Sequence, residues 1–387
     1  MPPAAAAAAK DENEEKEEEE DDAKRRRTTT TTTSRPLRLV VFSGAGLSAS
    51  TGMSTFSTPG GLYDRAKKAL GLPASGDGSR LFHYRAFASR ENDVHRFLAE
   101  LAAEAARASP GQGHRALARL ADEGLLARHY TMNVDGLAEE AGMRLWDWDR
   151  SSKEEEEDDD YGSTVELHGN VRRLVCRSCG ARGALTPHSL RDMREDKPLR
   201  CPRDNSTSCP PGSARTGILL YDDADAALIT PAAPTWRQLE RDLARCAAVL
   251  WLGISFEQSA SVGYFSRVVG VLRQARDGGQ GGGKEEEEAP GEAAAEAAAP
   301  RPAKKRAAVA ARPSPLPPQI LINPSEDAMF NLLSGAGAED LGEDVPLVEL
   351  RMDTDEALPA IADRLRRGDG GRGVGGGGGN GAKSGPE

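Results

Sequence analysis

The cysteines of this 387-residue chain have a spacing that points to a metal site. Cys176 and Cys179 form a CxxC pair, and Cys201 and Cys209 form a second, more widely spaced pair. Four thiolates in two pairs suit a tetrahedral structural zinc ion. Because the second spacing is unusual, a site that lacks Cys201 or Cys209 stays an alternative. The fifth cysteine, Cys246, lies at an apolar junction and is expected to be a core thiol.

A glycine turn follows the apolar, β-prone residues 37–43. Gly44, Ala45 and Gly46 end this run, and small helix-compatible residues follow. A strand, a glycine turn and a helix start can place a nucleotide pyrophosphate on free backbone N–H groups. Ala49 stands where the dinucleotide fingerprint has its third glycine. A nucleotide site and an ordinary turn of an α/β protein are therefore both open on this motif alone.

His168 lies between a β-prone triplet and a glycine, so we expect its ring at the end of an element, facing a cleft. Imidazole titrates near neutral pH and suits a general base, although a lone histidine is more often structural. The remaining histidines are expected on helix surfaces or in satisfied core positions: His83, His95, His114, His129 and His188.

The elements that must position these residues alternate between strands and helices, which indicates an α/β fold with a mostly parallel sheet covered on both faces. Strands are predicted at residues 37–43, 126–131, 218–221, 247–252 and 319–322, and helices at 65–109, 114–123, 236–245 and 261–275. Ligands bind such sheets at the carboxyl ends of strands. Four polar motifs are predicted at such ends: Ser43–Ser48, Asn133–Asp135, Asp222-Asp223 and Gly253–Ser255.

Composition divides the chain into foldable and low-complexity parts. Segments too polar or too repetitive to offset their ordering entropy are predicted to be disordered: 1–35, 151–161, 277–313 and 361–387. Three acidic runs hold 21 of the 61 acidic residues and 3 of the 50 basic ones, and two basic clusters hold nine more basic residues. The other 40 acidic and 38 basic residues nearly cancel, so charge favours neither nucleic-acid nor membrane binding. The sequence has no membrane-spanning run, and its cysteine usage suits a reducing compartment. Basic clusters at 24–27 and 304–306 suit nuclear import, although solvated linker charge explains them at least as well. The nucleus is the expected location, with the cytoplasm as the alternative.

The motifs together resemble those of the sirtuins, the NAD-dependent protein-lysine deacylases, over residues 36–360. The resemblance is carried by Gly44-Ala-Gly-Leu-Ser48, Thr131-Met-Asn-Val-Asp-Gly136, Leu167-His-Gly169, the CxxC pair, Gly253-Ile-Ser255 and Ile322-Asn323, in that order. It implies a Rossmann-like NAD domain, a helical module at 65–109 and a zinc module at 171–213. The substrates implied are NAD and an acylated-lysine protein, of which a histone is one candidate; the oligomeric state stays open.

The family's reaction transfers the acyl group from lysine to ADP-ribose and releases nicotinamide. The resemblance implies catalytic roles for His168 as base on a ribose hydroxyl, Asn133 at the ribose and its water, and Asp135 at the nicotinamide carboxamide. It implies that Phe56 caps the reacting carbon. The residues expected to bind the cofactor are Gly44, Ala45, Gly46, Ser48, Phe56, Met132, Asn133, Asp135, Gly253, Ser255 and Asn323. The expected zinc ligands are Cys176, Cys179, Cys201 and Cys209.

The chain departs from the family pattern at four places. Ser54-Thr55-Phe56-Ser57 replaces Pro-Asp-Phe-Arg, and Asp222-Asp223 replaces Gly-Glu. Met132 replaces a glutamine, and Ile254 replaces a threonine. Each lost hydrogen bond is worth about 1 kcal/mol. Two alternatives to a full deacylase therefore stay open: an NAD- or ADP-ribose-binding module with weak catalysis, and a mono-ADP-ribosyltransferase. A Rossmann dehydrogenase is disfavoured by the incomplete glycine fingerprint.

Overall fold

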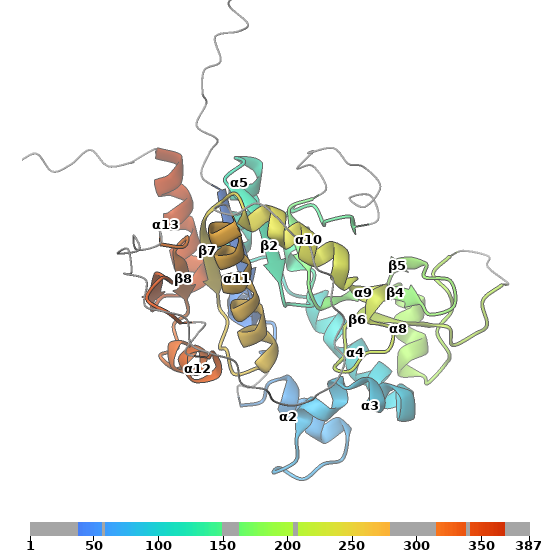
Figure 1. The fold of residues 1–387 in the computed structure, drawn as a ribbon. Helices are drawn as coiled ribbons and strands as arrows, with labels where there is room; N and C mark the ends of the chain where they lie inside the picture. The colour runs from blue at the N-terminus through green and yellow to red at the C-terminus, as the bar shows by residue number, and fades with distance from the viewer. Residues whose placement is uncertain are drawn as a thin grey trace, which may run out of the picture. The chain divides into compact units, whose positions relative to one another are not determined.

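A computed structural model describes residues 38–55, 59–148, 162–203, 208–278, 315–337 and 341–367 (Figure 1). The chain divides into the units Met1–Leu37 and Arg38–Glu387, and all described residues belong to the second. Of the segments predicted to be disordered, residues 1–35, 151–161, 279–313 and 368–387 lie outside the described residues. The prediction is wrong for residues 277–278 and 361–367, which are helical.

Six strands form a parallel sheet: β1 (Arg38–Ser43), β2 (Leu126–Thr131), β3 (Thr164–Glu166), β7 (Cys246–Leu252), β8 (Gln319–Ile322) and β9 (Leu347–Leu350). Their order is β3-β2-β1-β7-β8-β9, and every neighbouring pair is parallel. The strands β1, β2 and β3 follow one another toward one edge of the sheet, and β7, β8 and β9 follow one another toward the opposite edge. The predicted Rossmann-like α/β fold is confirmed, and its order reverses between β1 and β7, where ligands of such folds bind.

Helices cover both faces of this sheet (Figure 1). One face packs on the 3-10 helix η1 (Ala45–Thr51) and on α5 (Gln112–Asp122), α6 (Leu137–Glu140) and α13 (Thr354–Arg367). The other packs on α10 (Ala232–Leu243), α11 (Ser259–Gly278) and α12 (Asp327–Gly335). No helix in the described ranges is both long and apolar enough to cross a membrane.

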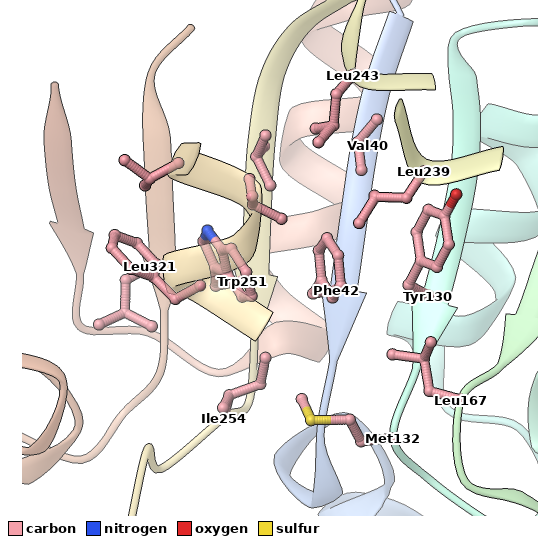
Figure 2. Close-up of a cluster of buried hydrophobic side chains, with 14 of the residues drawn as sticks. Val40, Phe42, Tyr130, Met132, Leu167, Leu239, Leu243, Trp251, Ile254 and Leu321 are labelled. Atoms are coloured by element: carbon pink, nitrogen blue, oxygen red, sulfur yellow. The ribbon is translucent and has the colours of Figure 1, made fainter. Parts of the chain in front are cut away.

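The side chains of β1 alternate between these two hydrophobic clusters. Leu39 and Val41 pack toward α5 and α13, whereas Val40 and Phe42 belong to the cluster that includes α10 and α11. In Figure 2, Phe42 lies between the rings of Trp251 and Tyr130, with centroids 4.5 and 5.1 Å from its own. A strand that is apolar on both faces is typical of the centre of a parallel sheet, which explains the continuous apolar run in its sequence.

A second, antiparallel sheet has the order β5-β4-β6. It is formed by β4 (Gly169–Cys176), β5 (Arg182–Ala184) and β6 (Ala214–Ile218), with α8 (Pro187–Arg194) and α9 (Ala226–Ile229) in the same part of the chain. The predicted helical segment forms α2 (Leu62–Ala69), η2 (Gly78–Phe82), α3 (Tyr84–Ser89) and α4 (Glu91–Ala105). These helices share a hydrophobic cluster with β4, β6 and α8.

Three expectations need correction. The run at 218–221 is not a strand of the parallel sheet: β6 ends at Ile218 in the small sheet, so Asp222-Asp223 does not follow a parallel strand. The segment after the glycine turn is a 3-10 helix, η1. Helix α13 continues to Arg367, beyond the boundary expected at 360, because buried Leu358 and Ala362 pack against the sheet cluster.

Candidate functional site

A cavity of about 440 Å³ lies at the carboxyl ends of β1, β2, β7 and β8. The residues that follow these strands line it: Gly44, Met132, Gly253 and Asn323. The opposite wall comes from the cluster shared by the helical module and the small sheet, through Phe82, Leu101, Ile218 and Leu220. The cavity thus joins the strand-order reversal to the helical module, and residues far apart in sequence meet in it.

The glycine turn after β1 packs directly on the turn after β7. The Gly44 N–H donates to the Leu252 carbonyl and the Gly46 N–H to the Gly253 carbonyl, each over 2.9 Å. A Cβ on Gly46 would lie 2.6 Å from the Gly253 Cα. The expectation that these N–H groups are free for a pyrophosphate is therefore wrong for Gly44 and Gly46. Glycine is needed here because two backbones touch, while Gly44, Ala45 and Gly46 still line the cavity.

His168 lies between β3 and β4 and lines the cavity. The next residue, Gly169, has a φ of +75°, and a Cβ there would lie 2.2 Å from the Gly217 carbonyl oxygen. This turn therefore depends on glycine and holds the imidazole at the cavity wall. The placement agrees with the expectation that the ring sits at an element end.

The hydrogen bonds of His168 define its tautomer. Nδ1 lies 3.1 Å from the Met132 carbonyl oxygen, which only accepts, so Nδ1 carries the proton. Nε2 lies 3.2 Å from the Tyr264 hydroxyl, which therefore donates to it. Burial lowers the pKa of His168 to about 4, against the opposing effect of the Met132 carbonyl. At neutral pH the ring is an uncharged base with its lone pair on Nε2.

Tyr264, on α11, was missed by sequence reasoning. Its neighbour Phe265 and the following Val268 are buried in the hydrophobic cluster. A tyrosine in such a helix therefore looks like core in the sequence. The structure shows that its hydroxyl reaches the cavity. Burial raises the pKa of Tyr264 to about 12, so the hydroxyl stays protonated.

Asn133, Ser48 and Asp135 form a hydrogen-bonded chain beside the cavity. The Asn133 amide donates to the Gly44 carbonyl over 3.0 Å and to the Ser48 hydroxyl over 3.1 Å. Ser48 in turn donates to the Asp135 carboxylate over 2.6 Å. Asn133 lines the large cavity, whereas Ser48 and Asp135 line a second, smaller cavity that shares Ala45 and Asn133 with it. The structure thus separates these predicted cofactor residues into two adjoining spaces.

His114 also joins this chain, which its sequence setting did not indicate. The Gly111 N–H donates to Nδ1 over 3.3 Å, so the proton of the neutral ring is on Nε2, 3.5 Å from the Ser48 hydroxyl. Burial lowers the pKa of His114, while Asp135 and Asp355 act in the opposite direction. The neutral His114 ring therefore contacts the Ser48 hydroxyl and places no positive charge next to Asp135.

The turn after β7 is held by Asn323, the residue that follows β8. The Asn323 amide donates to the Ile254 carbonyl over 2.9 Å, and its oxygen accepts from the Ser325 N–H over 2.9 Å. Asn323 and Ser255 both line the cavity. Ile254 and Met132 belong to the hydrophobic cluster, and both also line the cavity (Figure 2). Met132 and Ile254, which replace polar residues of the family pattern, thus extend the apolar core up to the cavity wall.

Comparison with known proteins decides the family. The Sir2 family model matches residues 44–258, more than half of the chain. The chain belongs to the Sir2 family. The matched residues include His168, the four clustered cysteines and most of the residues that line the cavity.

Relatives and solved structures agree with this membership. The Sir2 chain is 34% identical over 143 residues to NAD-dependent protein deacylase 2 of Pyrobaculum aerophilum, covering 37% of this chain and 46% of the relative. It is 29% identical to the NAD-dependent histone deacetylase HST3 of Saccharomyces cerevisiae, covering 44% and 38%. The chain thus spans about half or less of these relatives. A Sir2 homologue solved with NAD shares the fold, with a TM-score of 0.51, 20% identity and coverage of 86% and 90%.

The loop after η1 is held by an ion pair from the helical module. The Glu104 carboxylate accepts from the Ser54 N–H and pairs with the Arg65 guanidinium, each over 2.5 Å. Arg65 also donates to the Ser54 hydroxyl over 3.2 Å. The Sir2 chain lacks the family's acidic residue and arginine within this loop, and α2 and α4 provide a charge pair instead. Phe56, the expected cap of the reacting carbon, lies outside the described residues.

Asp222 and Asp223 stand where the family has Gly-Glu. Asp222 adopts a φ of +53°, a conformation that glycine takes more easily. The Asp223 side chain is buried and forms a two-pronged ion pair with Arg215, with both N–O distances 2.8 Å. It also accepts from the Leu220 and Asp225 N–H groups. Asp223 therefore holds the segment that lines the cavity and does not itself face it.

The four predicted metal ligands come together. Ligand atoms of Cys176, Cys179, Cys201 and Cys209 all lie within 4.8 Å of one another, so the wide second pair does not exclude either cysteine. Sγ of Cys179 and Sγ of Cys201 are 3.6 Å apart, close to the edge of ~3.8 Å of a tetrahedron with Zn–S bonds of ~2.3 Å. Although burial opposes ionisation, hydrogen bonding with Ser213 and with nearby backbone N–H groups lowers the pKa of Cys176 to about 6. The cluster is consistent with structural zinc.

Proposed function

We propose that this chain is an NAD-dependent protein-lysine deacylase. The observation that carries the proposal is the neutral His168, with Nε2 as acceptor, in the same cavity as the glycine turn at the strand-order reversal. Close approach of backbone at the turn, together with polar groups on Asn133, Ser255 and Asn323, fits a dinucleotide. The deacylase names of the relatives support the same function.

Three residues of the site have separate roles in the proposed reaction: His168, Asn133 and Asp135. NAD, when bound, supplies the ribose that accepts the acyl group and the nicotinamide that leaves. His168 takes a proton from a ribose hydroxyl at Nε2, because Nδ1 is already bonded to the Met132 carbonyl. Asn133 is positioned by Gly44 and Ser48 to orient the ribose and its water. Asp135, at the smaller cavity, accepts from the nicotinamide carboxamide.

The cavity wall favours an uncharged acyl group. Among the described residues that line it, none is lysine or arginine, Glu257 is the one carboxylate, and His168 is neutral. A succinyl-type carboxylate would lose its hydration without gaining a cation. Phe82, Leu101, Ile218 and Leu220 instead offer apolar contact for an acetyl or longer alkyl chain.

The deciding experiment incubates the full chain with NAD and a panel of acetyl-, butyryl- and succinyl-lysine peptides. Mass spectrometry should find nicotinamide, deacylated peptide and O-acyl-ADP-ribose, with the uncharged acyl groups turned over faster. His168→Ala should abolish turnover while calorimetry still detects NAD binding. Deacylation that survives this substitution would refute His168 as the base. Turnover fastest with the succinyl peptide would refute only the acyl preference.

A second candidate is an NAD-binding module with little turnover. Met132 and Ile254 favour it, because both present apolar side chains where a hydrogen bond to the cosubstrate is expected from the family pattern. NAD binding without nicotinamide release would support this candidate. ADP-ribosylated protein without deacylated peptide would instead support the mono-ADP-ribosyltransferase alternative.

A histone substrate and a nuclear location extend the main proposal. The relative named a histone deacetylase supports the first, and the basic clusters at 24–27 and 304–306, outside the described residues, support the second. Fluorescence imaging of the full chain, with and without alanines in both clusters, tests the location. A cytoplasmic distribution of the unsubstituted chain would contradict it and leave the cytoplasm as the alternative.

A further inference from the structure

The Tyr264 hydroxyl, which donates a hydrogen bond to Nε2 of His168, has no part in the function proposed so far. Tyr264 reaches the cavity from α11 and donates to Nε2 of His168 over 3.2 Å. Nε2 is the atom that must accept a proton from a ribose hydroxyl. A second hydroxyl can use this lone pair only if Tyr264 gives it up.

Packing determines where the Tyr264 hydroxyl can go. Its ring lies against Phe42 and Trp236, with centroid distances of 6.4 and 5.8 Å. The His168 ring centroid is 6.0 Å away. The ring thus packs on aromatic side chains while Tyr264 also lines the cavity, where another hydroxyl can approach Nε2.

We propose that Tyr264 is a positioning residue that stands in for the ribose hydroxyl: it holds Nε2 of His168 toward the cavity and is displaced when the cosubstrate binds. This inference rests on the proposed function for the identity of the displacing group. In the displacement one O–H···N hydrogen bond replaces another, so no covalent bond changes. The Tyr264 hydroxyl also satisfies the lone pair of Nε2 in the free protein.

The surroundings of the pair contain few other titratable groups. Among the described residues that line the cavity, these are Tyr63, Tyr221 and Glu257, besides His168 and Tyr264. Tyr221 contributes to the raised pKa of Tyr264 after the larger effect of burial. The pKa of His168 is lowered by burial and opposed by the Met132 carbonyl. The Tyr264 hydroxyl is the side-chain group that contacts Nε2 directly, so its removal should change the protonation of Nε2 in the free protein.

The test is Tyr264→Phe, read by pH profiles. A hydrogen bond donated to the neutral imidazole favours that form, so its removal should raise the pKa of His168 in the free protein. The acid limb of kcat/KM for NAD, which reports the free enzyme, should move up by about 0.5–1 pH unit. The acid limb of kcat should stay in place, because the ribose hydroxyl has already replaced Tyr264 in the complex.

Tyr130→Phe is the matched control, because it also removes a buried tyrosine hydroxyl. That hydroxyl donates to Asp242 over 2.7 Å, and neither residue lines the cavity. The acid limbs of Tyr130→Phe should match those of the unsubstituted protein. Unshifted limbs in Tyr264→Phe, or equal shifts in kcat and kcat/KM, would overturn the proposal. An NMR titration of His168 in the cosubstrate-free proteins should show the same upward shift and needs no turnover, so it tests the contact even if the deacylase proposal fails.

Discussion

Gly46 and Gly253 touch through their backbones at the point where the strand order of the parallel sheet reverses. The Gly46 N–H donates to the Gly253 carbonyl over 2.9 Å, and a Cβ on either residue would lie closer than 3.0 Å to backbone atoms of the other turn. The turns after β1 and β7 are thus one packed unit. The floor of the cavity depends on this unit, because both glycines line it.

Replacing Gly253 should damage both stability and cosubstrate binding. Gly253→Ala places a Cβ 2.5 Å from the Leu47 nitrogen at a φ of +57°. We expect a loss of about 1–3 kcal/mol in the free energy of unfolding and weaker NAD binding by calorimetry. Gly270→Ala on α11 is the control, because no atom lies within 4 Å of its added Cβ. It should be neutral or stabilise by about 0.5–1 kcal/mol, and equal losses in both variants would contradict the packing argument.

The free energy of unfolding should decrease as the pH is lowered below about 6.5, the pKa of histidine in the unfolded chain. Burial lowers the pKa of His95 to about 4, of His129 to about 3 and of His168 to about 4. Between these values and about 6.5 the unfolded chain binds protons that the folded chain does not, so acid favours unfolding. Three such groups give a slope of up to about 4 kcal/mol per pH unit. Denaturant titrations at pH 7.5, 6 and 5 measure it, and a flat profile would contradict the neutral buried imidazoles.

Zinc should be bound by all four clustered cysteines. The unsubstituted protein should contain zinc by elemental analysis, and Cys209→Ser should lose it just as Cys176→Ser does, because the ligand atoms of both belong to one cluster. Chelation should unfold the small sheet, since a structural zinc site contributes its binding energy to folding. Cys246→Ser, at the start of β7, should keep its metal. Full zinc content in Cys209→Ser would restore the alternative that this cysteine does not ligate.

The Arg65–Glu104 pair should control the loop before the NAD site. Glu104→Gln weakens the ion pair and one bond to Ser54, and we expect a higher KM for NAD with a smaller change in kcat. Glu100→Gln is the control, because Glu100 contacts the same guanidinium at 3.5 Å but is 68% exposed. An exposed pair is worth about 0–1 kcal/mol. Equal KM values for Glu104→Gln and the unsubstituted protein would show that the pair does not order this loop.

Much of the fold could be predicted from local patterns. The strands at 126–131 and 319–322 have the predicted limits, and β7 begins one residue before its predicted start. β7 and β8 are short, largely apolar runs in the interior of the parallel sheet, so hydrophobicity marks them. β2 is mostly buried but contains Arg128 and His129, so hydrophobicity alone does not mark it. The strands β3 and β9 were not predicted, because a strand of three or four residues at a sheet edge has too little periodicity to stand out.

The sequence by itself determined which chemical groups are present and near which elements: the glycine turn, His168 before a glycine, Asn133 and Asp135 after β2, and four cysteines in two pairs. Local order is enough for these, because each depends on neighbours along the chain. Only the tertiary structure decided that the Tyr264 hydroxyl bonds to Nε2 of His168 from 96 positions away and that the Arg65–Glu104 ion pair holds Ser54 in the loop. Such contacts follow from the packing of distant elements, and no spacing in the sequence encodes which side chains packing will bring within hydrogen-bond distance.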